Sequence, residues 1–255
     1  MLEIDKLYHG DCLELMHEID DGVINLVACD LPYGVTENKA DCRILLPALW
    51  KGYKRILVPG GAVVLTSQFP FTIDLIQSNR SWFRYDLIWD KVLVSGFLNA
   101  NRMPLRSHEH ILVFYGKLPT YNPQFTMGEQ THSRGGLKAK KSVNYGHYEQ
   151  VPTNDELRNK KHPTSIIRFQ KPHASKALHP TEKPVELFEW LIRTFSNQGD
   201  LVLDNTMGSG ATPLACIRSE RHFIGIDNNP EYVRIAEARI KQHMNQKKVF
   251  DYGAD

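Results

Sequence analysis

The stretch Leu201-Val-Leu-Asp-Asn-Thr-Met-Gly-Ser-Gly-Ala-Thr212 reads as a buried strand that ends in an acid, followed by a Gly-Ser-Gly turn that opens a helix. Gly208 and Gly210 let the backbone turn tightly and let a ligand approach where no Cβ intervenes. A second apolar strand, Phe223-Ile-Gly-Ile-Asp227, ends in another acid about twenty residues after the first. This spacing is typical of a nucleoside site in which a carboxylate accepts hydrogen bonds from ribose hydroxyls. The alternative is a purely structural strand–helix turn with an acid on the surface and no ligand.

NAD is the alternative ligand for such a site, because a dehydrogenase uses similar parts. Two features oppose it. Pro213 stands where the third glycine of the G-x-G-x-x-G pattern would fall, and the chain offers no set of residues suited to hydride transfer.

Short apolar runs alternate with amphipathic stretches along the chain, which predicts an α/β fold with a doubly wound, Rossmann-like sheet and helices on both faces. The expected strands are Val23 to Cys29, Gly61 to Thr66, Tyr85 to Trp89, Ile111 to Tyr115, Leu201 to Leu203 and Phe223 to Ile226. The expected helices are Leu45 to Ile56, Phe71 to Asn79, Val185 to Phe195, Ala211 to Ser219 and Pro230 to Met244. At 255 residues the chain fits one domain spanning 1–255.

The pattern fails between Lys117 and Leu178, which predicts an inserted functional region at residues 117–178. Residues 134–176 hold ten Lys/Arg and three acids, a local charge of +7, so the remainder carries 2 − 7 = −5. Such asymmetry favours a polyanionic partner reached by one segment, although a solvated surface loop would look the same.

The composition indicates a cytoplasmic protein that needs neither disulfides nor metal. The four cysteines are far apart and form no C-x-x-C pair or zinc-like cluster. The amino terminus is charged from its third residue, unlike a signal peptide, and the uncharged stretch Ile56 to Ile73 contains prolines and glycines, unlike a membrane span.

Asp30-Leu31-Pro32-Tyr33 follows directly on the apolar run Val23 to Cys29, so an acid, a rigid turn and an aromatic ring come where a strand ends. Alone, this could be an Asp/Pro turn with an exposed tyrosine. Together with the glycine turn, it resembles the catalytic and cofactor motifs of the β-class of DNA amino-methyltransferases. These enzymes move a methyl group from S-adenosylmethionine to the exocyclic amine of adenine or cytosine.

Two further segments match the family in its order along the chain. His179-Pro-Thr-Glu-Lys-Pro184 is similar to the segment that helps enclose the cofactor, and His9-Gly-Asp-Cys-Leu-Glu14 is similar to the segment whose acid reads the cofactor's adenine. The resemblance implies a permuted sheet in which the first strand of the chain lies beside the strand of Asp227. The cofactor residues it implies are Asp11, Cys12, Asp30, His179, Thr181, Lys183, Asp204, Met207, Gly208, Ser209, Gly210, Ala211, Thr212 and Asp227.

The chain departs from the family pattern at two places. Leu31 stands where proline is usual, but the resemblance gives that position only a main-chain carbonyl role, which leucine also supplies. Asp204-Asn205-Thr206 replaces the common Asp-Pro-Phe, which removes an aromatic ring beside the cofactor.

The resemblance assigns catalysis to Asp30, Leu31, Pro32 and Tyr33. The target base would be flipped out of the duplex and stacked on Tyr33, while the Asp30 carboxylate and the Leu31 carbonyl each accept one amine hydrogen. A leading Asp favours N6-adenine over N4-cytosine, and no Pro-Cys pair exists for C5-cytosine chemistry. The alternatives are methylation of an RNA or protein amine, and a catalytically silent nucleic-acid-binding relative.

The expected partner is double-stranded DNA, with a homodimer as a further possibility. Lys and Arg of the insertion would bind phosphates and so position the duplex. The candidates are Arg134, Lys138, Lys140, Lys141, Lys160 and Lys161.

Overall fold

The computed structural model describes the chain except for residues 1, 35–43, 130–158, 173–181 and 252–255. The described residues form two compact units. The larger unit comprises residues 1–122 and 165–255, and the smaller comprises residues 123–164.

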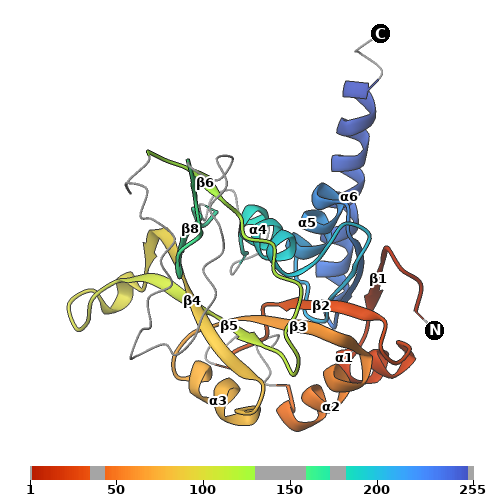
Figure 1. Ribbon diagram of the computed structural model, residues 1–255, viewed down its shortest axis with the longest axis horizontal. Helices are drawn as coiled ribbons and strands as arrows, with labels where there is room; N and C mark the ends of the chain where they lie inside the picture. The colour runs from red at the N-terminus through yellow and green to blue at the C-terminus, as the bar shows by residue number, and fades with distance from the viewer. Residues whose placement is uncertain (1, 35–43, 130–158, 173–181, 252–255) are drawn as a thin grey trace, which may run out of the picture. The chain divides into compact units, whose positions relative to one another are not determined.

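The larger unit is built on an eight-stranded sheet with the order β1-β10-β9-β2-β3-β5-β4-β8 (Figure 1). The first five strands in this order, β1, β10, β9, β2 and β3, run parallel to their neighbours. β5 is antiparallel to both β3 and β4, and β8 is parallel to β4. The strands are β1 (Lys6–His9), β2 (Ile24–Cys29), β3 (Leu57–Ser67), β4 (Phe83–Ser95), β5 (Arg106–Phe114), β8 (Ile166–Arg168), β9 (Leu201–Asp204) and β10 (His222–Asp227).

Helices cover both faces of this sheet because the side chains of its central strands alternate between two cores. In β2, Val27 and Cys29 pack with the helices α2 (Leu46–Ile56) and α3 (Phe71–Ser78). Leu26 and Ala28 point the other way, into a core with α4 (Val185–Phe195) and α5 (Ala211–Ser219). The remaining helical elements are α1 (Cys12–Leu15), η1 (Met16–Glu18), η2 (Phe97–Asn99) and α6 (Pro230–Asp251).

The doubly wound fold expected from the sequence is confirmed, as is its permutation. All six expected strands and five expected helices form, with β3, β4 and β5 longer than predicted. The first strand of the chain, β1, pairs with β10 and places His9 beside Asp227. The chain turns in opposite directions from β9 and β2, so the binding edge lies at the carboxyl ends of these two neighbours.

The expected insertion divides between the two units. Residues 117–122 and 165–178 belong to the range of the larger unit, where β8 extends the main sheet. In the smaller unit, β6 (Thr126–Met127) pairs with β7 (Lys160–Lys161), and the Lys160 ammonium lies 5.9 Å from the centroid of the Phe125 ring. The recognition role of this region stays a prediction.

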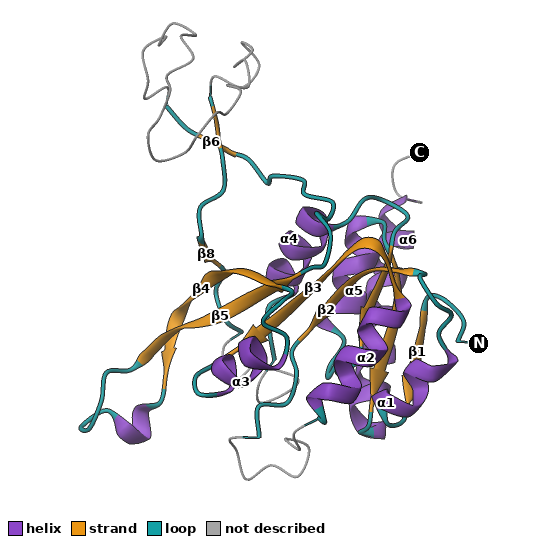
Figure 2. Cartoon of the chain, turned by 60° about the horizontal axis from the view of Figure 1, so that its bottom comes forward, coloured by secondary structure: helices purple, strands orange, loops and turns teal. Residues whose placement is uncertain are grey.

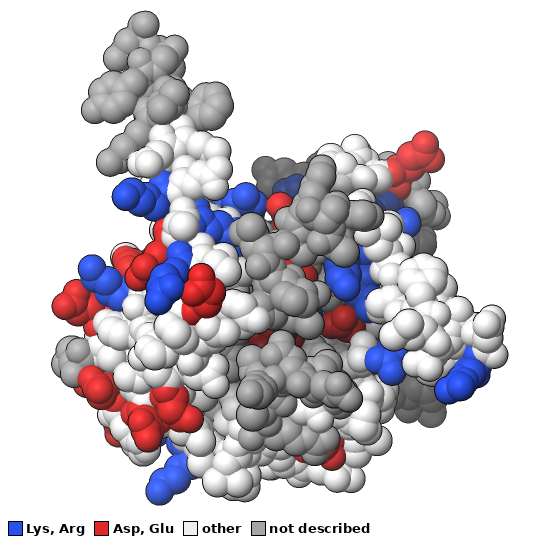
Figure 3. Space-filling view, turned by 180° about the vertical axis from the view of Figure 1, so that it is seen from behind, with Lys and Arg blue, Asp and Glu red and all other residues white. Residues whose placement is uncertain are grey.

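β4 and β5 form a long hairpin with η2 at its tip, which extends away from the helices of the larger unit (Figure 2). Phe97 and Leu98 at this tip are exposed. On the face shown in Figure 3, several acidic side chains gather at the lower left, and basic side chains are spread over the face, the left side included.

Candidate active site

A cavity of about 490 Å³ opens at the carboxyl edge of the sheet, where β1, β2, β9 and β10 end. This volume is in the range of small-molecule sites. The predicted site residues that line it are Asp11, Cys12, Asp30, Leu31, Pro32, Tyr33, Lys183, Asp204, Met207, Gly208, Ser209, Ala211, Thr212 and Asp227. Segments more than two hundred residues apart in sequence, those of Asp11 and Asp227, thus meet in one site, as the motif order required.

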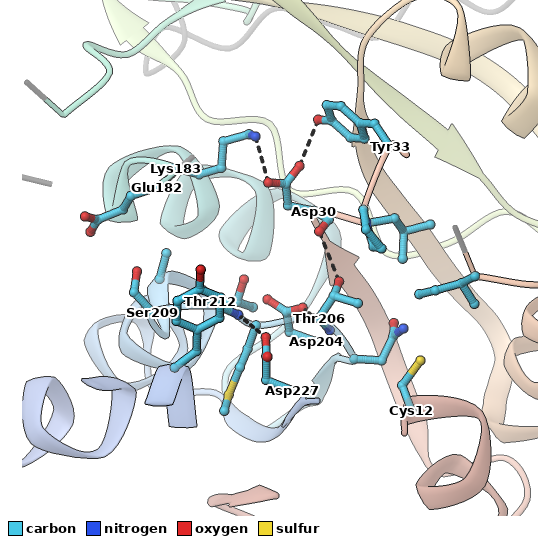
Figure 4. Close-up of a pocket in the computed structure, with 18 of the residues that line it drawn as sticks. Cys12, Asp30, Tyr33, Glu182, Lys183, Asp204, Thr206, Ser209, Thr212 and Asp227 are labelled. Atoms are coloured by element: carbon cyan, nitrogen blue, oxygen red, sulfur yellow. Dashed lines mark hydrogen bonds and ion pairs between the residues drawn. The ribbon is translucent and has the colours of Figure 1, made fainter. Parts of the chain in front are cut away.

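The Asp30 carboxylate is held from three sides. Its Oδ1 accepts hydrogen bonds from the Tyr33 hydroxyl, at 2.8 Å, and from Thr66 Oγ1. Its Oδ2 accepts one from Lys183 Nζ, at 2.7 Å. Figure 4 shows Lys183 and Tyr33 approaching this carboxylate from different sides. Asp30 therefore has a fixed orientation, which is what a positioned acceptor requires.

Leu31 and Tyr33 belong to the wall of the cavity. Leu31 is 2% exposed and its side chain packs into the core beneath α2 and α3. The Tyr33 ring lies 5.5 Å from the Phe71 ring, and burial together with the nearby Asp30 raises the pKa of its hydroxyl well above the ordinary value. The Tyr33 hydroxyl therefore keeps its proton and donates a hydrogen bond to Asp30.

The glycine turn connects β9 to α5 and is tied to β10. Gly208, with φ of +52°, donates its backbone N–H to Asp227 Oδ2 at 2.8 Å. Gly210 does not line the cavity. Its φ is +80°, and a Cβ there would lie 2.7 Å from the Cβ of Ala236 on α6, so this glycine allows α5 and α6 to pack closely.

Three carboxylates face the cavity around this turn. Asp11 caps α1 by accepting the N–H groups of Leu13 and Glu14, at 2.7 and 3.2 Å. Asp227 accepts the N–H of Asn229 at 2.8 Å. Asp204 is 3% exposed, and burial, followed by the charges of Asp30 and Asp227, raises its pKa to about 7 although two threonines bind it.

Asn205, which stands where the family usually has proline, builds a polar cluster under the cavity. Its Oδ1 accepts hydrogen bonds from the Tyr53 hydroxyl, at 2.5 Å, and from the Cys29 thiol, at 2.9 Å. Thr206, in place of phenylalanine, donates its hydroxyl to the backbone carbonyl of Asp30 at 3.1 Å. The two departures thus link the glycine turn to the Asp30 loop.

Four charged residues that line the cavity were not predicted: Lys91, Glu109, Lys171 and Glu182. Glu109 on β5 and Lys91 on β4 line the cavity and form an ion pair of 3.2 Å, with side chains only 12% and 1% exposed. Glu109 also lies 3.4 Å from Lys183. Lys91 and Glu109 lie close to the apolar runs of β4 and β5, so the sequence could have extended both predicted strands to include them. Nothing local in the sequence indicates that the two side chains are buried together.

Other predicted residues lie elsewhere. His179 and Thr181, and the DNA-binding candidates Arg134, Lys138, Lys140 and Lys141, fall outside the described residues. Lys160 and Lys161 lie on β7 of the smaller unit. Within the described ranges, no cluster of His, Cys, Asp and Glu could hold a metal ion, and no helix is long and apolar enough to cross a membrane.

The cavity fits S-adenosylmethionine, which carries a cationic sulfonium and ammonium and two ribose hydroxyls. The cavity's carboxylates, Asp11, Asp204 and Asp227, suit both the cationic groups and the hydroxyls of this cofactor. A Cβ at Gly208 would meet nothing within 4 Å, so there is open space beside the turn.

Comparisons with known proteins identify the family of this chain. Residues 24–238 match the model of the N6/N4 DNA methylase family. The Type II methyltransferase M1.MboII of Moraxella bovis is 28% identical over 258 residues, which cover 95% of this chain and 98% of the relative. The DNA adenine methyltransferase YhdJ of Escherichia coli K12 is 27% identical, with 93% and 83% covered.

Two solved structures share the fold. The complex of M1.HpyAVI with SAM superposes with a TM-score of 0.62 at 21% identity, covering 92% of this chain and 98% of that one. The PvuII DNA methyltransferase, described as cytosine-N4-specific, gives a TM-score of 0.65 at 17% identity, covering 91% and 84%. With its family match spanning the Asp30 loop and the glycine turn, this chain belongs to the N6/N4 family of S-adenosylmethionine-dependent DNA methylases.

Proposed function

We propose that this chain methylates the N6 amine of adenine in duplex DNA. The observation that carries the proposal is the Asp30 carboxylate, fixed by Tyr33, Thr66 and Lys183 in the same cavity as the carboxylates of Asp204 and Asp227. One end of the cavity thus offers acceptors to an amine, and the other offers carboxylates to a cationic nucleoside cofactor.

Bound S-adenosylmethionine supplies an electrophilic methyl group. Asp11, Asp204, Asp227 and the turn from Met207 to Thr212 would hold the cofactor. Asp30 and Lys183 contact each other in the structure, so we assign both to the catalytic end of the cavity instead of the cofactor end.

The target amine is a poor nucleophile because its lone pair is delocalised into the base. Asp30 and the Leu31 carbonyl would each accept one amine hydrogen, which localises the lone pair on nitrogen. Tyr33 would stack on the flipped base, and Pro32 would hold the loop. As positive charge develops on the amine nitrogen, the fixed Asp30 carboxylate stabilises it without having to reorganise. The base reaches this site only outside the duplex, at a cost of a few kcal/mol for unstacking.

Adenine is favoured over cytosine because the catalytic tetrad begins with Asp, and YhdJ, a relative over most of the chain, is named an adenine enzyme. N4-cytosine is the second candidate, since the PvuII enzyme shares the fold.

DNA would be bound in part by residues 123–164, where Lys160 and Lys161 are the described candidates. A homodimer would cover the exposed apolar residues of the β4–β5 hairpin, Phe97 and Leu98 among them. Sedimentation of the wild type and of a Phe97→Ser/Leu98→Ser variant tests this: a dimer that the double variant weakens supports it, and a monomeric wild type rejects it.

Replacing Asp30 by Ala tests the function itself. The variant should bind S-adenosylmethionine in a calorimeter as the wild type does, but transfer methyl groups to duplex DNA at least 10²–10³-fold more slowly. Transfer at the wild-type rate would reject the assignment of Asp30, and transfer by the wild type to RNA or protein alone would reject DNA as the substrate.

A further inference from the structure

The Lys183 ammonium lies between two carboxylates. It donates a hydrogen bond to Asp30 Oδ2 at 2.7 Å, and Glu109 Oε2 lies 3.4 Å from it on the other side. Its side chain is 9% exposed, so bulk water solvates the ammonium poorly and its charge is balanced by Asp30 and Glu109.

On the proposed function, Lys183 lies where the target base would bind. The ammonium is 5.5 Å from the centroid of the Tyr33 ring, and it occupies Asp30 Oδ2, the oxygen of that carboxylate not already shared by Tyr33 and Thr66. A base that stacks on Tyr33 and donates its amine to Asp30 competes with the lysine for both groups.

Glu109 is arranged to receive the lysine. Lys91 Nζ holds Glu109 Oε1 at 3.2 Å and is itself bound to Ser95 Oγ at 3.0 Å, which fixes the carboxylate in place. Glu109 Oε2 is buried and accepts no hydrogen bond from any residue in the described ranges. Buried acceptors are ordinarily hydrogen-bonded, and the Lys183 ammonium, 3.4 Å away, is the donor that can satisfy this oxygen by a small movement toward it.

The charges of Asp30 and Glu109 keep Lys183 protonated, so its ammonium can move from one carboxylate to another without losing its proton. Burial would raise the pKa of Glu109, but Lys183 and Lys91 outweigh it and the net pKa is lowered. Burial would lower the pKa of Lys183, yet Asp30, Tyr33 and Glu109 raise it well above the ordinary value. A buried ammonium that leaves one carboxylate therefore needs another, and Glu109 lies within reach.

We propose that Glu109 is a positioning residue that takes over the Lys183 ammonium from Asp30 when the target base enters the cavity. The inference rests on the proposed function. In the free enzyme Lys183 keeps Asp30 paired; with the base bound, Lys183 pairs with Glu109, and Asp30 Oδ2 accepts the amine hydrogen. Glu109 acts through Lys183 and does not touch the reacting atoms.

The test is a Glu109→Gln variant in an assay of base insertion. The probe is a duplex whose recognition sequence has been mapped from methylated DNA of expressing cells. It carries 2-aminopurine beside the target adenine, so that the target keeps its N6 amine and its departure from the stack raises the fluorescence of its neighbour. Fluorescence is followed with S-adenosylhomocysteine present, so no turnover is needed. Glu109→Gln should weaken base insertion roughly tenfold or more, because one charged hydrogen bond is lost, while calorimetry shows unchanged affinity for S-adenosylhomocysteine.

The effect of Glu109→Gln is measured a second time in a Lys183→Met variant, which separates a role through Lys183 from a purely structural role. Without the ammonium there is nothing to transfer, so Glu109→Gln should then have no further effect on insertion. Asp86→Asn is the matched control, since Asp86 on β4 pairs with His110 at 3.0 Å and does not line the cavity. It should insert the base as the wild type does.

Insertion by Glu109→Gln at the wild-type level, or the same loss with and without Lys183, would overturn the inference and leave the proposed function standing. A wild type that methylates no DNA would overturn the proposed function, and the inference with it.

Discussion

Replacing Asp204 by Asn should remove a large pH dependence of stability. The pKa of Asp204 is raised from 3.8 to about 7 in the folded chain, chiefly by burial. The folded state therefore holds its proton more tightly than the unfolded state. The stability associated with this proton is complete below pH 3.8 and is lost as the pH rises through 7.

The size of the effect follows from the pKa shift. Each pKa unit corresponds to about 1.4 kcal/mol, so a shift of about three units costs the wild type on the order of 4 kcal/mol between pH 4 and pH 8. Asp204 is 3% exposed, so little screening by solvent is expected. Asparagine does not titrate, and the other ionisable groups are common to both proteins.

Urea unfolding of the two proteins at pH 4, 5, 6, 7 and 8 measures this difference. The free energy of unfolding of Asp204→Asn minus that of the wild type should increase by several kcal/mol over the range. Saturating S-adenosylmethionine should reduce the increase, because a cationic ligand stabilises the ionised carboxylate. A difference that stays constant with pH would show that Asp204 ionises normally and would refute the reasoning.

Three further variants test separate parts of the account. Gly210→Ala should destabilise the chain by about 2–4 kcal/mol in urea unfolding, since it adds a clash with Ala236 to a strained φ. The matched control is Gly199→Ala, which has the same φ of +80° but open space around the new Cβ, so it should lose only about 1 kcal/mol. Equal losses in the two variants would exclude the clash. Leu31→Pro should keep methyl transfer within a few-fold of the wild type, because the carbonyl remains, and a collapse of turnover would give the leucine side chain a role of its own. Lys160→Ala with Lys161→Ala should lower the slope of log affinity against log salt by about two, measured by fluorescence anisotropy with duplex DNA, and an unchanged slope would remove both lysines from the interface.

Local sequence patterns were sufficient for much of the fold and for the main parts of the site. Apolar runs ending in an acid located β2, β9 and β10, and strands that share a carboxyl edge bring their terminal acids together. The family order of motifs then correctly placed the first strand of the chain beside β10.

What the sequence could not supply depends on contacts between distant segments. Lys183 and Asp30 are 153 residues apart, and nothing local indicates that they pair. Lys91 and Glu109 look like the polar ends of strands, and only the antiparallel pairing of β4 with β5 shows that both are buried beside the cavity. Asp11 caps α1 and also lines the cavity, and its role in reading the cofactor's adenine stays a prediction.

The central claim is that the site at Asp30 methylates the N6 amine of adenine in DNA. The most direct measurement is incubation of duplex DNA with the protein and S-adenosylmethionine labelled in its methyl group, digestion to nucleosides and mass spectrometry. The account predicts label in N6-methyldeoxyadenosine with the wild type and none with Asp30→Ala. Label in N4-methyldeoxycytidine, or label that persists in Asp30→Ala, would contradict it.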